Sequence, residues 1–338
     1  MERASRAWTP RPEGVAAGRR DQEVYGSVLE RIGGTPLIAL KGIRPEGCAR
    51  ILLKVESENP TGSMKDRMAL AMIEAAERRG RLRPGGRVVE YTGGSTGVSL
   101  ALICAARGYP LSLVTSDAFS AEKRAHMAAL GAELTLVPSE AGGMDEALTR
   151  NMIAAAREIA EGSGAYWTDQ LNNADQLEAY HAMGAEIWRQ TEGRIDAFVQ
   201  STGTAASLRG VAEALRDRNP DIRIVAVEPA ESPVLSGGET GVHKIEGIGA
   251  GFVVPLWEPS LVDEIIAVST DEAMAMARRL ARAAGLFAGT STGANLVAAM
   301  AVGRRLGPEA TVVTVMCDSG LKYLSTALYG AGASTGTA

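Results

Sequence analysis

The chain has few cysteines, few aromatic residues and no surplus of basic residues. Its cysteines, Cys48, Cys104 and Cys317, form no C-x-x-C pair, which argues against a disulfide framework and against a zinc site. The net charge of -5 argues against a protein that mainly binds nucleic acid. The longest apolar run, at 98–106, is too short to span a membrane. We therefore expect a cytoplasmic protein without a nucleic-acid partner, a membrane segment or a metal.

The two ends of the chain differ in composition from the rest. Residues 1–24 contain five arginines and two prolines but no apolar stretch, which argues against a secretory signal. Residues 331–338 contain only glycine, alanine, serine and threonine. We expect both segments to be flexible tails.

Between these ends, short β-rich runs alternate with amphipathic helical segments. After Lys65, for example, apolar residues recur at helical spacing until Gly80 ends the pattern. With 338 residues, of which 46% are apolar, the chain can bury the cores of two lobes. The alternation predicts an α/β fold with parallel sheets and with ligands at the carboxyl ends of the strands. Strands are expected at 51–55, 88–91, 111–115, 134–138, 197–200, 222–227 and 311–315.

Three loops combine glycine with hydroxyl residues just before an expected helix. They lie at 92–97, 203–207 and 289–293. Small residues let the backbone approach a ligand closely, and the free N–H groups at a helix start attract a phosphate or a carboxylate. One such loop is more simply explained as a tight turn with a hydroxyl helix cap. Three of them in one chain favour a binding site for an anion.

Several common motifs are missing or incomplete. No Walker sequence is present, and the glycines of 247–251 do not match the G-x-G-x-x-G spacing of dinucleotide-binding loops. The pattern G-x-S-x-G occurs twice and would make Ser95 or Ser291 the nucleophile of an α/β-hydrolase. That class of enzyme needs a late histidine, and the last 95 residues contain none. The hydrolase hypothesis is therefore disfavoured.

Lysine is scarce, since the chain has six lysines and 29 arginines. A retained lysine suggests a task that a guanidinium cannot perform, such as forming an imine. Lys65 is the best candidate because it lies where a turn is expected to meet a helix. The plainer alternative is a solvated lysine paired with Asp66.

Residues 59–67, NPTGSMKDR, resemble the lysine motif of fold-type II pyridoxal-phosphate enzymes, in particular the cysteine synthase (O-acetylserine sulfhydrylase) and cystathionine β-synthase family. Three further segments resemble motifs of that family in the same order. They are YGSVLERIGGTPLIAL at 25–40, GVHKIEGIGAGF at 241–252 and DSGLKYLST at 318–326. In all, the resemblance covers about 25–329.

The resemblance implies a fold and a domain organisation. It implies two doubly wound α/β domains with mostly parallel sheets, as in the β subunit of tryptophan synthase. Residues 57–162 would form the smaller domain. Residues 25–56 plus 163–330 would form the larger, cofactor-binding domain, with the cofactor in the cleft between the two.

The resemblance also implies roles for individual residues. Lys65 would be the catalytic residue, the Schiff-base lysine of pyridoxal 5'-phosphate. Ser291 would face the pyridine nitrogen, where a neutral hydroxyl favours elimination at Cβ. The other cofactor-binding residues would be Ser95, Gly203, Thr204, Ala205, Ala206 and Ser207. The substrate-binding residues would be Thr92, Gly93, Gly94, Ser95, Thr96 and Gln170.

Two loops depart from the family pattern. Ser95 stands where the family has an asparagine that contacts the phenolic oxygen of the cofactor, and serine is shorter, with one donor instead of an amide. In the phosphate loop, Ala205, Ala206 and Ser207 replace Gly-Gly-Thr, a change that leaves the backbone donors in place. The first departure bears on the reaction, and the second leaves the phosphate contacts intact.

The activity implied by the resemblance is β-replacement on an O-activated L-serine, in which O-acetylserine and sulfide give L-cysteine and acetate. One alternative is β-replacement with another nucleophile, an amine or a thiol, and another is a β-elimination lyase in a specialised pathway. A third is a non-catalytic homologue that binds a partner. The family also implies a homodimer, and a C-terminal peptide of serine acetyltransferase as a partner.

Overall fold

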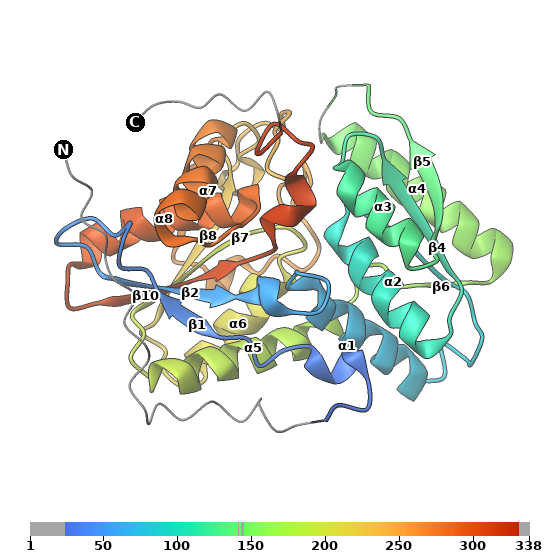
Figure 1. Cartoon of the computed structure of the whole chain (residues 1–338), viewed down its shortest axis with the longest axis horizontal. Helices are drawn as coiled ribbons and strands as arrows, with labels where there is room; N and C mark the ends of the chain where they lie inside the picture. Colours follow the sequence, from blue (N-terminus) through green and yellow to red (C-terminus); the bar gives the residue numbers. More distant parts are fainter. Residues whose placement is uncertain (1–23, 141, 143–144, 331–338) are drawn as a thin grey trace, which may run out of the picture.

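The computed structural model describes residues 24–140, 142 and 145–330. The expected tails at 1–24 and 331–338 lie outside these residues, apart from Val24. Two separate sheets with their helices form the described part of the chain, the larger at the left of Figure 1 and the smaller at the right.

The larger sheet has six strands in the order β1-β2-β10-β7-β8-β9. Its strands and helices are β1 (Leu37–Ala39), β2 (Arg50–Val55), α5 (Gln176–Thr191), β7 (Ala197–Ser201), α6 (Ala206–Arg216), β8 (Arg223–Pro229), β9 (Glu264–Val268), α7 (Thr270–Ala284), α8 (Thr290–Leu306) and β10 (Thr311–Met316). All neighbouring strands are parallel except β1 and β2. Ile224 of β8 lies in a core cluster with α5 and α6, whereas Val225 lies in a cluster with α7 and α8. Helices therefore cover both faces of this sheet.

The smaller sheet has four parallel strands in the order β5-β4-β3-β6. Its elements are α1 (Lys65–Arg78), β3 (Val88–Tyr91), α2 (Ser95–Arg107), β4 (Leu111–Ser116), α3 (Ala121–Ala129), β5 (Glu133–Val137), α4 (Glu146–Ser163) and β6 (Tyr166–Trp167). Val89 packs with residues of α4, and Val88 packs with residues of α1 and α2 on the opposite face. Both sheets are thus doubly wound, which confirms the predicted fold class.

Each expected strand is present close to its expected bounds, but three strands were not expected. These are β1, β6 and β9, and each lies at an edge of its sheet. Their residues are mostly half-buried, so their hydrophobic pattern is weak. Because β6 pairs with β3, the smaller sheet continues past residue 162, where we expected the smaller domain to end.

Short 3-10 helices connect these elements: η2 (Val28–Arg31), η3 (Glu56–Glu58), η4 (Val234–Ser236), η5 (Pro259–Leu261) and η6 (Gly320–Tyr323).

Within the described ranges, no helix combines the length and the apolar character needed to cross a bilayer.

A buried ionic network joins β2, α1 and α5. Lys54 Nζ lies 2.6 Å from Glu186 Oε2, and Arg67 Nη2 lies 2.7 Å from the same oxygen. Arg67 also bonds Glu56 at 2.7 Å through Nε. Burial by itself would raise the pKa of Glu186, but the hydrogen bonds and charges of Arg67 and Lys54 outweigh it and lower that pKa from 4.5 to about 2.

We expect Glu186→Gln to lower the free energy of unfolding by about 3–5 kcal/mol at neutral pH, because two buried cations lose their shared partner. The pKa of Glu186 is lower in the folded state, so its contribution is complete above about 4.5 and is lost as the pH falls toward about 2. Urea unfolding at neutral pH and near pH 3, followed by circular dichroism, measures both effects.

The exposed pair of Glu192 and Arg194 supplies the control, since Glu192→Gln should cost less than about 1 kcal/mol. If acid destabilised the Glu186→Gln variant as strongly as the unmodified protein, this account of the network would be wrong.

Candidate active site

A cleft lies between the two sheets, at the carboxyl ends of their strands. It encloses about 860 Å³ of space, including open solvent at its mouth. Its walls come from both units: the loop after β3 and the start of α3 on one side, and the loops after β7 and β10 on the other. The expected ligand position at strand ends therefore coincides with a cavity.

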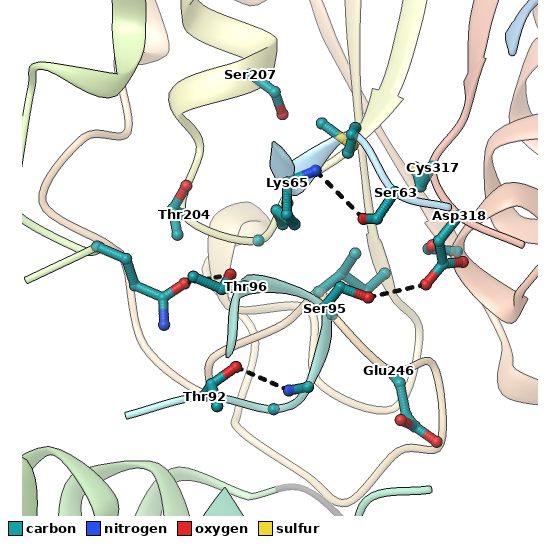
Figure 2. A pocket seen from close by; sticks show the side chains of 18 of the residues that line it. Ser63, Lys65, Thr92, Ser95, Thr96, Thr204, Ser207, Glu246, Cys317 and Asp318 are labelled. Atoms are coloured by element: carbon teal, nitrogen blue, oxygen red, sulfur yellow. Dashed lines mark hydrogen bonds between the residues drawn. The ribbon is translucent and has the colours of Figure 1, made fainter. Parts of the chain in front are cut away.

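Lys65 enters this cleft from the first turn of α1. In the view of Figure 2 it lies between Thr204 on one side and Ser63 and Asp318 on the other. Among the described residues, its Nζ forms no hydrogen bond and no ion pair. Burial lowers the pKa of the Lys65 amine, and the nearby Cys317 and Asp318 oppose that shift. The arrangement favours a neutral, nucleophilic amine.

The alternative pairing of Lys65 with Asp66 is not formed. The Asp66 carboxylate is buried and accepts hydrogen bonds from Thr61 N at 2.8 Å, Thr61 Oγ1 at 2.5 Å and Ser99 Oγ at 2.6 Å. Its hydrogen-bond donors are thus Thr61, which precedes α1, and Ser99, which lies in α2. Lys65 thus faces the cleft without a counterion from its own helix.

The loop at 92–97 is folded around one hydroxyl group. Thr92 Oγ1 accepts hydrogen bonds from Gly94 N at 2.9 Å and from Gly97 N at 3.0 Å. Gly94 has φ +133, and the side chain of Lys123 packs where its Cβ would lie, so glycine is required there. Within the part of the chain described, the amides of Gly93, Ser95 and Thr96 donate no hydrogen bond. Free amides at the start of a helix, here α2, suit an anion.

Side-chain contacts fix the two hydroxyl residues that follow. Ser95 Oγ donates to Asp318 Oδ2 at 3.1 Å, and Thr96 Oγ1 donates to Gln170 Oε1 at 2.8 Å. Gln170 is held in turn by the carbonyl of Tyr91, which accepts from its Nε2 at 2.8 Å. Gln170, which is 74 residues from Thr96 in the chain, therefore supports the loop and lines the cleft.

The loop at 203–207 presents a second, longer row of donors. None of its five backbone amides donates a hydrogen bond to any residue that the structure describes. The chain turns at Ala205, whose φ is +67, and α6 begins directly afterwards. Consecutive free amides at a helix N-terminus suit a phosphate. Gly203, Thr204 and Ser207 line the cleft, whereas the side chains of Ala205 and Ala206 are buried.

The third loop, at 289–293, contributes fewer residues to the cleft than the other two. Ser291 lines the cleft at the start of α8 and is buried. Gly293, by contrast, lies where a Cβ would collide with the carbonyl of Ala273 on α7. Glycine here lets α7 and α8 approach each other, so part of this motif serves helix packing.

Sequence reasoning missed three charged residues that line the cleft: Lys123, Glu246 and Asp318. Lys123 Nζ lies 2.7 Å from Glu246 Oε2 and 4.1 Å from the centre of the Tyr323 ring. The scarcity of lysine could have pointed to Lys123. Asp318 begins the segment 318–326 that resembles a family motif, but its contact with Ser95, 223 residues away, could not be predicted from the sequence.

Comparison with known proteins agrees with this geometry. Residues 28–318 match the model of a family described as pyridoxal-phosphate dependent enzyme. A cysteine synthase of Staphylococcus aureus is 43% identical over 310 residues, 91% of this chain and 98% of that protein.

Solved structures are similar over most of the chain. A cysteine synthase from Entamoeba histolytica has a TM-score of 0.85 at 36% identity, covering 97% of this chain and 94% of that one. An O-ureido-L-serine synthase has a TM-score of 0.86 at 35% identity, covering 93% and 98%. The chain therefore belongs to the pyridoxal-phosphate dependent enzyme family, in the group that contains the cysteine synthases.

Proposed function

We propose that the chain is a cysteine synthase that holds pyridoxal 5'-phosphate in the cleft between its two sheets. The five free amides of 203–207 fit a phosphate group, and Gly203 leaves no room for a side chain beside the Gly247 carbonyl. The unpaired amine of Lys65 fits the covalent attachment of an aldehyde. Ser291 would contact the ring nitrogen. The donor set thus fits this cofactor.

Individual residues of the chain would have separate roles in the reaction. Bound pyridoxal phosphate supplies an electron sink for the substrate amino acid. The neutral amine of Lys65 would take the proton from the substrate Cα and later return it. The free amides of Gly93, Ser95 and Thr96 would bind the α-carboxylate, with Gln170 keeping Thr96 in place.

The favoured reaction is replacement at Cβ of O-acetyl-L-serine. The bond from Cβ to the acetate oxygen breaks, a bond from Cβ to sulfur forms, and the products are L-cysteine and acetate. The observation that carries this proposal is the free Lys65 amine between two loops of unbonded amides, in a chain 43% identical to a cysteine synthase.

The test is spectroscopic. The purified protein is mixed with cofactor, and O-acetylserine, O-phosphoserine and serine are added in turn. We expect the cofactor absorption band to change with O-acetylserine and to return on addition of sulfide, as cysteine accumulates. An unchanged band with O-acetylserine would reject this substrate, and a change reversed only by an amine or another thiol would favour the alternative nucleophile. Ser95, in place of the family asparagine, motivates that second candidate.

The organisation of the protein completes the proposal. A homodimer, a cytoplasmic location and binding of a serine acetyltransferase C-terminal peptide in the cleft are expected from the family. The cysteines are free and buried, which supports a reducing compartment. A monomeric mass in solution would exclude the dimer.

A further inference from the structure

The carboxylate of Asp318 accepts hydrogen bonds from two hydroxyl groups, one in each of the two units. Asp318 Oδ2 accepts from Ser95 Oγ at 3.1 Å and from Tyr323 OH at 2.7 Å. Asp318 and Tyr323 belong to the chain after β10, whereas Ser95 begins α2. Figure 2 shows the Ser95 hydroxyl directed toward Asp318, at the side of the cleft where Ser63 and Lys65 lie.

The direction of these hydrogen bonds follows from the chemistry of the groups. A carboxylate can only accept, so both hydroxyls must donate to Asp318. The amine of Lys322 is an electrostatic neighbour of Asp318 and suits a negative charge there. Serine has one proton to give, and in this arrangement the proton is directed at Asp318. Ser95 therefore presents lone pairs to any ligand beside it.

Asp318 and its partner Tyr323 are well enclosed. Asp318 is 4% exposed and Tyr323 is 1% exposed. A side chain at Gly289 would collide with Asp318 Oδ1, and the ring of Tyr323 packs against the same glycine position. Asp318 therefore cannot turn away from Ser95, which is half-buried at the cleft, without moving its neighbours.

We infer that Asp318 is a positioning residue that fixes Ser95 as a hydrogen-bond acceptor toward the cleft. This inference rests on the proposed function and on the family resemblance, which implies that Ser95 takes the place of the asparagine beside the phenolic oxygen of the cofactor. An acceptor at that place favours the form of the cofactor that keeps its phenolic proton. A donor, such as the asparagine amide of the family pattern, favours the form without it.

The two forms of the cofactor absorb at different wavelengths, so the test is an absorption spectrum of the cofactor-loaded protein. We expect the band of the protonated phenol, at shorter wavelength, to dominate. Asp318→Leu has nearly the same shape but accepts no hydrogen bond. It should move the ratio of the two bands about tenfold toward the longer wavelength, the scale of one hydrogen bond to a charged group.

A double-mutant cycle separates positioning from a general structural effect. If Asp318 acts through Ser95, Asp318→Leu should leave the band ratio unchanged in a Ser95→Ala background. Tyr323→Phe is the matched control, since it removes the other hydroxyl from the same oxygen and should preserve the ratio.

Three results would overturn the inference. The first is a dominant long-wavelength band in the unmodified protein, which can be observed even if Asp318→Leu does not fold. The second is an equal shift in the presence and absence of the Ser95 hydroxyl. The third, the absence of any cofactor band, would overturn the proposed function as well and is thereby distinguished from the other two.

Discussion

Replacing Lys65 with alanine is expected to lower the rate of cysteine formation by about 10⁴-fold or more, because one amine both attaches the cofactor and moves the substrate proton. The other lysine in the cleft cannot substitute for it. Lys123 Nζ is held 2.7 Å from Glu246 and lies over the Tyr323 ring. Steady-state rates and the cofactor absorption band measure the loss.

Two variants accompany this experiment. Lys65→Arg keeps a positive charge but supplies a guanidinium, which does not form an imine, so it should be as inactive as the alanine variant. Lys41→Ala removes an exposed lysine and should retain full activity. Substantial activity in Lys65→Arg would show that charge rather than nucleophilicity is required at this position.

The second large effect concerns the proposed phosphate loop. A Cβ at Gly203 would lie 2.5 Å from the Gly247 carbonyl oxygen, which is a backbone atom. The loop must then move, and its amides lose their common direction. We expect Gly203→Ala to weaken cofactor binding by about 10- to 100-fold, since overpacking of this kind costs about 1–3 kcal/mol. Equilibrium dialysis with pyridoxal phosphate measures the affinity.

Gly162→Ala is the matched control for this substitution. Apart from its chain neighbours and the backbone of its own helix, no heavy atom lies within 4 Å of the position of its Cβ, and Gly162 is in α4, where alanine is the better helix former. Its cofactor affinity should equal that of the unmodified protein. Unchanged affinity in Gly203→Ala would remove the loop at 203–207 from the proposed phosphate site.

The central strands of both sheets could be predicted because they are buried on both faces. In β2, β3, β4, β7, β8 and β10 nearly every residue is buried, which produces continuous apolar runs. The strands that were not predicted, β1, β6 and β9, are half-exposed and lie at sheet edges, although β5, an edge strand of similar exposure, was predicted. Because β6 was not expected, the continuation of the smaller sheet past residue 162 was not expected either.

In the candidate site, too, local sequence patterns could be predicted and contacts between distant residues could not. The loops at 92–97 and 203–207 and the scarce Lys65 are local patterns, and both loops and the lysine meet in the cleft. The pairing of Lys65 with Asp66 was a local alternative that failed. Asp66 is instead occupied by Thr61 and by Ser99, which lies on another helix.

Local sequence therefore determined the fold class, the family and the elements that carry the site, because strand burial and anion loops depend on residues close together in the chain. The tertiary structure alone decided which polar and charged side chains of the cleft face one another. The pairs Ser95–Asp318 and Lys123–Glu246 are 223 and 123 residues apart. Contacts between such distant residues depend on how the two sheets are placed, which leaves no trace in spacing or composition.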